Sequence, residues 1–170
     1  MLRIILDTNI YSTIAKDKNS KEITERIKNI KDLKIYSYRP IKEEIKSIPK
    51  TLRYDGHKLR TLLINLYFDL IKEQYPESSA IKKLAELYYK EFKFKKLGGK
   101  RSFDDLRIDF EIVACAAIHK LDLITSEDEK TLKGSIALEA YKNVSLRNRL
   151  KPPNFYNYND LKKKIIGLSS

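Results

Sequence analysis

Acidic residues stand at the ends of the segments that the sequence predicts as buried strands, or in the first turns of neighbouring helices. They are Asp7, Glu43, Glu44, Asp109, Glu127 and Asp128. In an open parallel sheet, the chain beyond the carboxyl ends of the strands forms one edge, and ligands bind there. We therefore expect carboxylates from four separated segments of the chain to meet at a single edge of the sheet.

A cluster of carboxylates of this kind has a defined chemical use. Carboxylates that crowd together in a partly buried site repel one another, so protons or cations must neutralise them. Oxygen ligands suit Mg²⁺ or Mn²⁺, which keep several of their waters and bridge phosphates. A bound divalent ion lowers the pKa of a water molecule and offsets charge on phosphoryl oxygens. The residue pattern therefore predicts hydrolysis of phosphodiester bonds.

The composition indicates a globular domain with an anionic partner. The chain has 170 residues, with 35 Lys and Arg against 23 Asp and Glu, which gives a formal charge of +12. The length corresponds to one domain, residues 1–170, and the 42% hydrophobic content excludes a disordered tail. A strongly basic surface favours RNA or DNA as a partner, although a Lys-rich composition alone accounts for the same charge.

The sequence gives three expectations about location. A single cysteine, Cys115, excludes an internal disulfide framework and a Cys-based zinc cluster within one chain, and it fits a reducing compartment. No apolar run approaches the ~20 residues that cross a bilayer. The first residues lack the apolar core and cleavage site of a signal peptide. We expect a cytoplasmic protein with no membrane partner.

Strands alternate with helices along most of the chain. The expected strands are 2–6, 34–38, 121–125 and 143–145. The expected helices are 10–15, 58–73, 79–96, 128–132, 136–141 and 159–166, with three more that begin at Ser20, Pro40 and Asp109. This order predicts a three-layer α/β/α fold with a mostly parallel central sheet. The helices 58–73 and 79–96 are expected to form a helical hairpin insertion, about 55–97, ended by Gly98 and Gly99.

Two runs of the sequence resemble the PIN-domain ribonucleases. Residues 4–10 read Ile-Ile-Leu-Asp-Thr-Asn-Ile, and in that family Asp-Thr-Asn or Asp-Thr-Ser follows the first strand. Residues 109–128 resemble the second hallmark, in which an Asp begins a helix of small apolar residues and the next strand ends in Thr-x-Asp. The nearest subgroup is the VapC-type toxins of toxin–antitoxin pairs. The resemblance covers most of 1–50 and 103–165 and leaves 55–97 outside.

The resemblance implies roles for the residues of the first two motifs. Asp7 would be a metal ligand, directly or through water, and Asn9 would hydrogen-bond in the acidic pocket and hold Asp7 in place. The family's second acid lies early in the helix after strand two and precedes an apolar residue. Glu44, followed by Ile45, fits this description better than Glu43, which stays an alternative.

The resemblance also implies roles for the residues of the second hallmark. Asp109 fits the third acid. The fourth position, two residues after Thr125, is Glu127 where the family has Asp, so either Glu127 or Asp128 would complete the site. Thr125 would orient a water or an oxygen of the fourth acid.

The function implied is a Mg²⁺- or Mn²⁺-dependent endoribonuclease in which a metal-activated water attacks RNA without a covalent intermediate. A toxin of this kind would form a homodimer and would be inhibited by a small antitoxin that covers the acidic groove. The main alternative is a non-catalytic RNA-binding or assembly module with a degenerate site. Haloacid-dehalogenase phosphatases also place Asp after strand one, but they need a second Asp where this chain has Asn9.

Other reactive side chains receive structural interpretations. His57 and His119 could act as an acid–base pair in a metal-independent ribonuclease, but we expect surface histidines. Cys115 lies on an Ala/Val helix face and is expected to be a buried small hydrophobic residue. The aromatic and basic segment 88–96 could stack bases, but we expect its aromatic rings in the core or in a dimer contact and its lysines in solvent.

Overall fold

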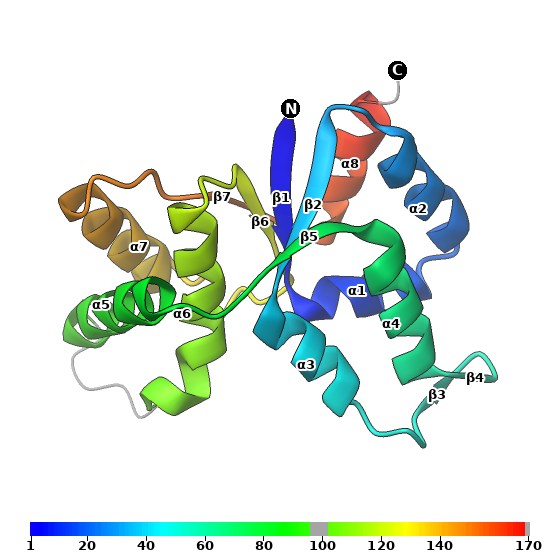
Figure 1. The fold of residues 1–170 in the computed structure, drawn as a ribbon, viewed down its shortest axis with the longest axis horizontal. Coiled ribbons are helices and arrows are strands. Elements are labelled where there is room, and N and C mark those ends of the chain that lie inside the picture. Colours follow the sequence, from blue (N-terminus) through cyan, green and yellow to red (C-terminus); the bar gives the residue numbers. More distant parts are fainter. Residues whose placement is uncertain (96–101, 169–170) are drawn as a thin grey trace.

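A computed structural model of the chain describes residues 1–95 and 102–168. Five strands form one parallel sheet in the order β5-β2-β1-β6-β7 (Figure 1). Their bounds are β1 Leu2–Leu6, β2 Leu33–Tyr38, β5 Ile71–Tyr75, β6 Leu123–Thr125 and β7 Asn154–Tyr156. A separate antiparallel hairpin consists of β3 Arg53–Tyr54 and β4 His57–Lys58. The predicted α/β fold with a parallel sheet is confirmed.

Helices cover both sides of the sheet, as Figure 1 shows. One group packs around α4 and comprises α1 Thr8–Lys16, α2 Ser20–Asn29, α3 Arg39–Ser47, α4 Leu59–Leu70 and α8 Tyr158–Leu168. The other group consists of α5 Ser79–Lys95, α6 Phe103–Ile118 and α7 Ser135–Arg147. None of the helices in the described part of the chain has the length and apolar character needed to cross a membrane.

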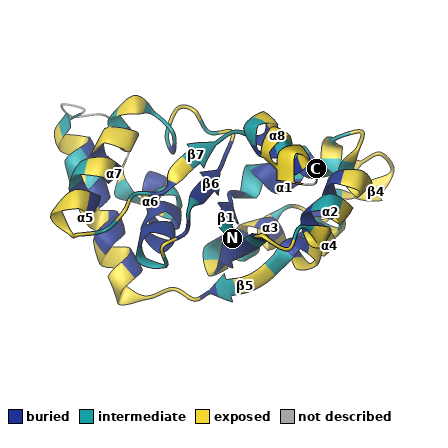
Figure 2. Ribbon diagram, turned by 90° about the horizontal axis from the view of Figure 1, so that it is seen from above, coloured by how far each residue is buried: buried dark blue, intermediate teal, exposed yellow. Residues whose placement is uncertain are grey.

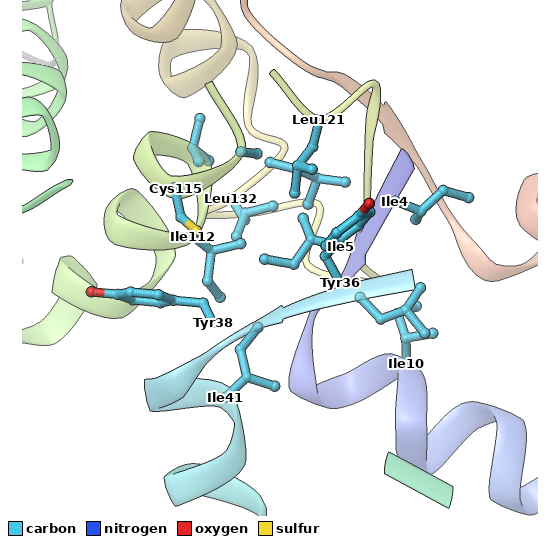
Figure 3. Close-up of a cluster of buried hydrophobic side chains, with 14 of the residues drawn as sticks. Ile4, Ile5, Ile10, Tyr36, Tyr38, Ile41, Ile112, Cys115, Leu121 and Leu132 are labelled. Carbon is cyan, nitrogen blue, oxygen red and sulfur yellow. The ribbon is translucent and has the colours of Figure 1, made fainter. Parts of the chain in front are cut away.

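The core lies along the central strand. Ile4, Ile5 and Leu6 of β1 have no exposed surface, because neighbouring strands and helices on both faces cover them (Figure 2). Ile4 pairs with Ile35 of β2 on one side and with Leu123 of β6 on the other. A continuous apolar run is typical of a parallel strand buried on both faces. Figure 3 shows this cluster reaching from the sheet to α6.

Within the described residues, the structure does not pair the two helices of the predicted hairpin: α4 packs with α1, α2 and α3, whereas α5 packs with α6 and α7, and the strand β5 lies between α4 and α5 in the chain. Residues 71–73 were expected in a helix, but Ile71–Tyr75 forms β5 and pairs with β2. An edge strand needs only one buried face, so Lys72 and Glu73 stay exposed and give the segment a polar, helix-like pattern. The close helical pair in this region is α5 with α6. Gly98 and Gly99, expected to end the hairpin, lie outside the described residues.

Three further segments differ from the expectations. The predicted strand 143–145 is part of α7, where Val144 and Ser145 are buried at helical spacing from Ala140 and Tyr141. The predicted helix 128–132 is a series of turns. The strand β7 was not predicted, because it is only three residues long and directly follows the two prolines. It forms because it pairs with β6.

Two local motifs, a hairpin turn and a capping box, set the bounds of neighbouring elements. The hairpin β3–β4 turns at Asp55 and Gly56, whose φ values of 48° and 76° suit a two-residue hairpin turn. The helix α6 begins at Phe103 because Ser102 and Asp105 form a capping box. Asp109 therefore lies in the second turn of its helix rather than at the helix start.

Candidate functional site

Asp7 anchors the carboxyl end of β1. Its side chain is 7% exposed and is the N-cap of α1, where Oδ1 accepts from the Thr8 backbone N–H at 2.7 Å. Its Oδ2 accepts from the Asn9 amide at 2.5 Å and from the Ser126 hydroxyl at 2.7 Å. The hydrogen bond expected between Asn9 and Asp7 is thus present. Capping one helix uses Oδ1 alone, so it does not account for the two further donors on Oδ2.

Ser126 joins the ends of β1 and β6, and the sequence analysis gave it no role. It directly follows β6 as Asp7 directly follows β1, and the two strands pair through Leu6 and Thr125. Besides donating to Asp7, the Ser126 oxygen accepts from the backbone N–H of Asp128 at 3.0 Å. Its position after a buried strand was the signal available in the sequence.

Glu44 is the carboxylate of α3 that contacts the start of α1, just after Asp7. Its Oε2 accepts from the Thr8 hydroxyl at 2.5 Å, a contact that ties α3 to the first residue of α1. Glu43, one residue earlier, instead pairs with Lys46 at 3.2 Å. Both acids line the same groove, but only Glu44 is hydrogen-bonded to the segment that carries Asp7.

Thr131 brings Asp109 and Asp128 together. Its hydroxyl lies 3.1 Å from Oδ2 of Asp109 and within hydrogen-bond reach of Oδ2 of Asp128. The other oxygen of Asp128 accepts from the backbone N–H groups of Lys130 and Thr131, both at 2.9 Å. This turn fixes the direction of the Asp128 carboxylate. Thr131 lies in an irregular turn, so no pattern in the sequence predicted its contact.

Glu127 and Thr125 are placed differently from the other candidates. The Glu127 carboxylate accepts from the Tyr158 backbone N–H at 2.7 Å, at the start of α8, and it does not line the groove that holds Asp128. Its own backbone N–H donates to Asn9 Oδ1 at 3.0 Å. The Thr125 hydroxyl is buried and has no hydrogen-bond partner among the residues that the structure describes.

The site residues open into one groove with a volume of about 1010 Å³. Of the described residues that line it, eight are acidic and one, Arg107, is basic. Four acids come from different segments of the chain and are those predicted to meet: Asp7, Glu44, Asp109 and Asp128. The groove lies beyond the carboxyl ends of β1, β2 and β6, where the topology places a ligand.

The charges of this cluster affect one another. Burial raises the pKa of Asp109 to about 7, and the negative charge of Asp7 adds to the shift, against a smaller lowering by the Thr131 hydrogen bond. Burial also raises the pKa of Asp7, while the Ser126 and Thr8 hydrogen bonds oppose it and the charges of Glu44 and Asp128 reinforce it. The cluster therefore carries more negative charge than its own hydrogen bonds compensate.

The donor set suits a hard cation that keeps part of its water shell. Among the described residues, no three or more His, Cys, Asp or Glu side chains are grouped so that they could hold a metal ion. Mg²⁺ is commonly held by one or two carboxylates, with water and phosphate oxygens as its other ligands. The carboxylate oxygens of the groove fit that arrangement, in which water supplies the remaining ligands. The described residues do not form a closed cage of protein ligands.

The histidines and the cysteine lie outside the groove lining. His57 is exposed on β4, whereas His119 stacks on Tyr75 with ring centroids 3.7 Å apart and is half-buried. The expectation of a surface residue thus fits His57 better than His119. Cys115 is buried, and burial raises the pKa of its thiol to about 12, as expected for a core residue.

The aromatic residues of segment 88–96 divide between core and surface. Tyr88 and Phe92 are buried, and Tyr88 hydrogen-bonds to Ser145 at 2.8 Å, so the core interpretation holds for these two. Phe94 is 81% exposed.

Comparison of the sequence with models of known protein families and with curated proteins gives no match.

Proposed function

We propose that the chain is a Mg²⁺- or Mn²⁺-dependent endoribonuclease similar to the PIN-domain family. The observation that carries the proposal is the convergence of Asp7, Glu44, Asp109 and Asp128 in one groove beyond the carboxyl ends of the strands. Separate segments of the chain bring the buried Asp7 and the half-buried Asp109 and Asp128 together with the exposed Glu44 here, at an electrostatic cost. A folded chain offsets that cost by binding a cation.

Asp7, Asp109 and Asp128 would hold the ion, directly or through water, and Glu44 would bind one of its waters from the opposite wall. We favour Asp128 over Glu127 as the fourth acid, because the Glu127 carboxylate accepts from the Tyr158 backbone N–H at the start of α8 and does not line the groove. When bound, the ion supplies a water of lowered pKa and offsets charge on the phosphoryl oxygens.

The protein residues prepare the site for this chemistry. Asn9 and Ser126 both donate to Oδ2 of Asp7 and fix the orientation of its carboxylate. Because burial raises the pKa of Asp109 to about 7, this carboxyl would carry a proton for part of the time near neutral pH without a cation, and it would be ionised with a cation bound. We expect no covalent intermediate, because the thiol of Cys115 is buried away from the groove and the groove presents carboxylates.

RNA is the substrate that the charge of the chain supports. The chain has a formal charge of +12 although eight acids and one basic residue line the groove, so the excess of basic residues lies outside it and would draw the phosphate backbone toward the site. The finer proposal is a VapC-like toxin in the cytoplasm, which would form a homodimer and would be inhibited by a small antitoxin protein. A small gene overlapping the upstream end of its gene would support that assignment.

The test is cleavage of RNA by the purified chain. We expect cleavage with Mg²⁺ or Mn²⁺, none with EDTA, and loss of at least about 100-fold in Asp7→Asn and Asp109→Asn, since even groups that merely orient metal ligands are worth about 10- to 100-fold. Asp32→Asn is the matched control, because Asp32 is exposed and lies at the opposite end of β1. Full cleavage by both site variants would exclude this mechanism.

A second candidate is a non-catalytic RNA-binding or assembly module. Two observations favour it: Glu127 points to α8, and the described residues form no direct three-ligand metal cage. This candidate predicts RNA binding that is unaffected by EDTA and no cleavage of any RNA tested with Mg²⁺ or Mn²⁺.

A further inference from the structure

Glu111 is a buried carboxylate in the groove that the proposed reaction does not use. It lies on α6, 1% exposed, within an otherwise apolar run from Phe110 to Ile118. Its Oε2 accepts from the Tyr38 hydroxyl at 2.9 Å, and Figure 3 shows the Tyr38 ring reaching from the end of β2 toward α6. No donor in the described part of the chain reaches its other oxygen, Oε1.

Glu111 is separate from the four-acid cluster although it lines the same groove. Two residues along an α-helix correspond to about 200° of rotation, so Asp109 and Glu111 leave α6 in different directions. Asp109 meets Thr131, and Glu111 meets Tyr38. Glu111 therefore occupies a position in the groove apart from the four-acid cluster.

An unpaired buried carboxylate oxygen is costly, and its chemistry defines what would satisfy it. A carboxylate oxygen accepts hydrogen bonds and cannot donate them. The hydrogen of Tyr38 is already given to Oε2, so the Glu111–Tyr38 pair offers acceptor capacity alone to a molecule in the groove. Leaving a buried acceptor unpaired carries a desolvation penalty, which a ligand with a neutral N–H or O–H group would remove.

We infer that Glu111, held by Tyr38, is a subsite that accepts a hydrogen bond from a neutral donor of a nucleotide next to the scissile phosphate. This inference rests on the proposed function, because it takes the groove to bind RNA. RNA offers such a donor in three places, the ribose 2′-hydroxyl, the exocyclic amino group of adenine, cytosine or guanine, and the ring N–H of uracil or guanine. The first source would select RNA over DNA, and the other two would select among bases.

The variant Glu111→Gln replaces a hydrogen-bond acceptor at this position by a donor, with little change in side-chain volume. The carbonyl oxygen of Gln would take the place of Oε2 and accept from Tyr38, which turns the amide NH₂ toward the position of Oε1. A donor then faces the donor of the ligand. Tyr38→Phe is the complementary variant, since it leaves both carboxylate oxygens of Glu111 as acceptors.

The experiment measures binding of four short single-stranded oligonucleotides by fluorescence anisotropy. Oligo(rA) carries the 2′-hydroxyl and the amino group, oligo(rU) the 2′-hydroxyl and the ring N3–H, oligo(dA) the amino group alone, and oligo(dU) the ring N3–H alone. Ca²⁺ replaces Mg²⁺, and a gel verifies that each oligonucleotide stays intact. The wild type is compared with Glu111→Gln, with Tyr38→Phe and with Glu22→Gln, which removes one charge from the Glu22–Arg26 pair on α2, outside the groove.

We expect Glu111→Gln to weaken binding about tenfold for the oligonucleotides that carry the recognised donor and to leave the others within about twofold of the wild type. A loss for both RNA oligonucleotides identifies the 2′-hydroxyl, a loss for both adenine oligonucleotides identifies the amino group, and a loss for both uracil oligonucleotides identifies the ring N–H. Tyr38→Phe and Glu22→Gln should keep the wild-type preference. Each variant is checked for a wild-type thermal unfolding transition.

Three results overturn the inference. The first is an equal change for all four oligonucleotides in Glu111→Gln, and the second is no change for any. The third is loss of the preference in Tyr38→Phe as well, which would mean that the pair acts through folding. A wild type that cleaves RNA but shows any of these results leaves the proposed function intact. A wild type that neither binds these oligonucleotides nor cleaves RNA overturns both.

Discussion

The side-chain amide of Asn9 donates to Oδ2 of Asp7 at 2.5 Å while its carbonyl oxygen accepts from the backbone of the loop after β6. One side chain thus orients the buried carboxylate and fixes the loop that carries Asp128. The amide also occupies the position at which a haloacid-dehalogenase phosphatase needs a second carboxylate, so the contact argues against that alternative. Two residues after Asp7 the chain therefore carries an amide donor and not the carboxylic acid that would protonate a leaving group in that reaction.

This contact gives the first prediction. Asn9→Asp replaces a donor to Asp7 by a further negative charge, so the pKa of Asp7 should rise further and RNA cleavage at neutral pH should fall about 10- to 100-fold. Cleavage rates at several Mg²⁺ concentrations check the change, and Asn9→Ser, which keeps a donor, should lose less. Wild-type cleavage by Asn9→Asp would show that the amide has no role in orienting Asp7.

The sequence alone predicted those elements whose structure follows from one local pattern of apolar residues. The apolar run of β1 can only be a doubly buried strand, and Asp7 ends it, so both followed from the pattern. The parallel topology then placed Glu44 and Asp109 at the same edge without any contact being known. The strand β5 was missed because an edge strand has half of its residues in solvent.

The direction in which a side chain points could not be predicted from the sequence. Whether Glu127 or Asp128 faces the groove depends on the N-terminus of α8, about thirty residues further along, which captures the Glu127 carboxylate at Tyr158. Thr131 and Glu111 were missed for the same reason, since their partners come from α6 and β2 and no local spacing links them. A charged residue within the apolar run of α6 was the available signal for Glu111.

The second prediction separates the two acids after β6. Glu127→Ala removes one hydrogen bond to the first residue of α8, whose N-cap Asn157 stays in place, and should cost about 0.5–1.5 kcal/mol of unfolding free energy while keeping most RNA cleavage at saturating Mg²⁺. Asp128→Ala should abolish cleavage, because it removes a proposed ligand. Urea unfolding and cleavage assays on both variants check this. The opposite assignment, with Glu127 as the ligand, requires Glu127→Ala to be inactive while folded.

The third prediction concerns stability in the absence of a divalent ion. The pKa of Asp109 is raised to about 7 in the folded chain, above its ordinary value, so the folded state binds its proton more tightly than the unfolded state does. Stability from this group is present at low pH and is lost as the pH rises toward and through about 7. In EDTA the melting temperature should therefore fall over this range.

Two comparisons test the assignment of that pH dependence to Asp109. Asp109→Asn has no titrating group at this position, so its melting temperature should depend less on pH than that of the wild type. Added Mg²⁺ should restore the wild type most strongly above about pH 7, because the ion replaces the proton. A wild type and an Asp109→Asn variant with parallel pH profiles would contradict the assignment.

The fourth prediction concerns Ser126, whose hydroxyl lowers the pKa of Asp7 against the larger effect of burial. Ser126→Ala removes this hydrogen bond, so the pKa of Asp7 should rise and the acid limb of the pH–rate profile should move to higher pH at subsaturating Mg²⁺. Because the carboxylates are coupled, the limb reports an apparent pKa of the cluster. The rate on the alkaline plateau should change much less than the midpoint, because Asp7 is fully ionised there in both proteins. Ser12→Ala, at another serine of the same groove, is the control, and a midpoint equal in Ser126→Ala and the wild type would mean that Asp7 does not titrate with activity.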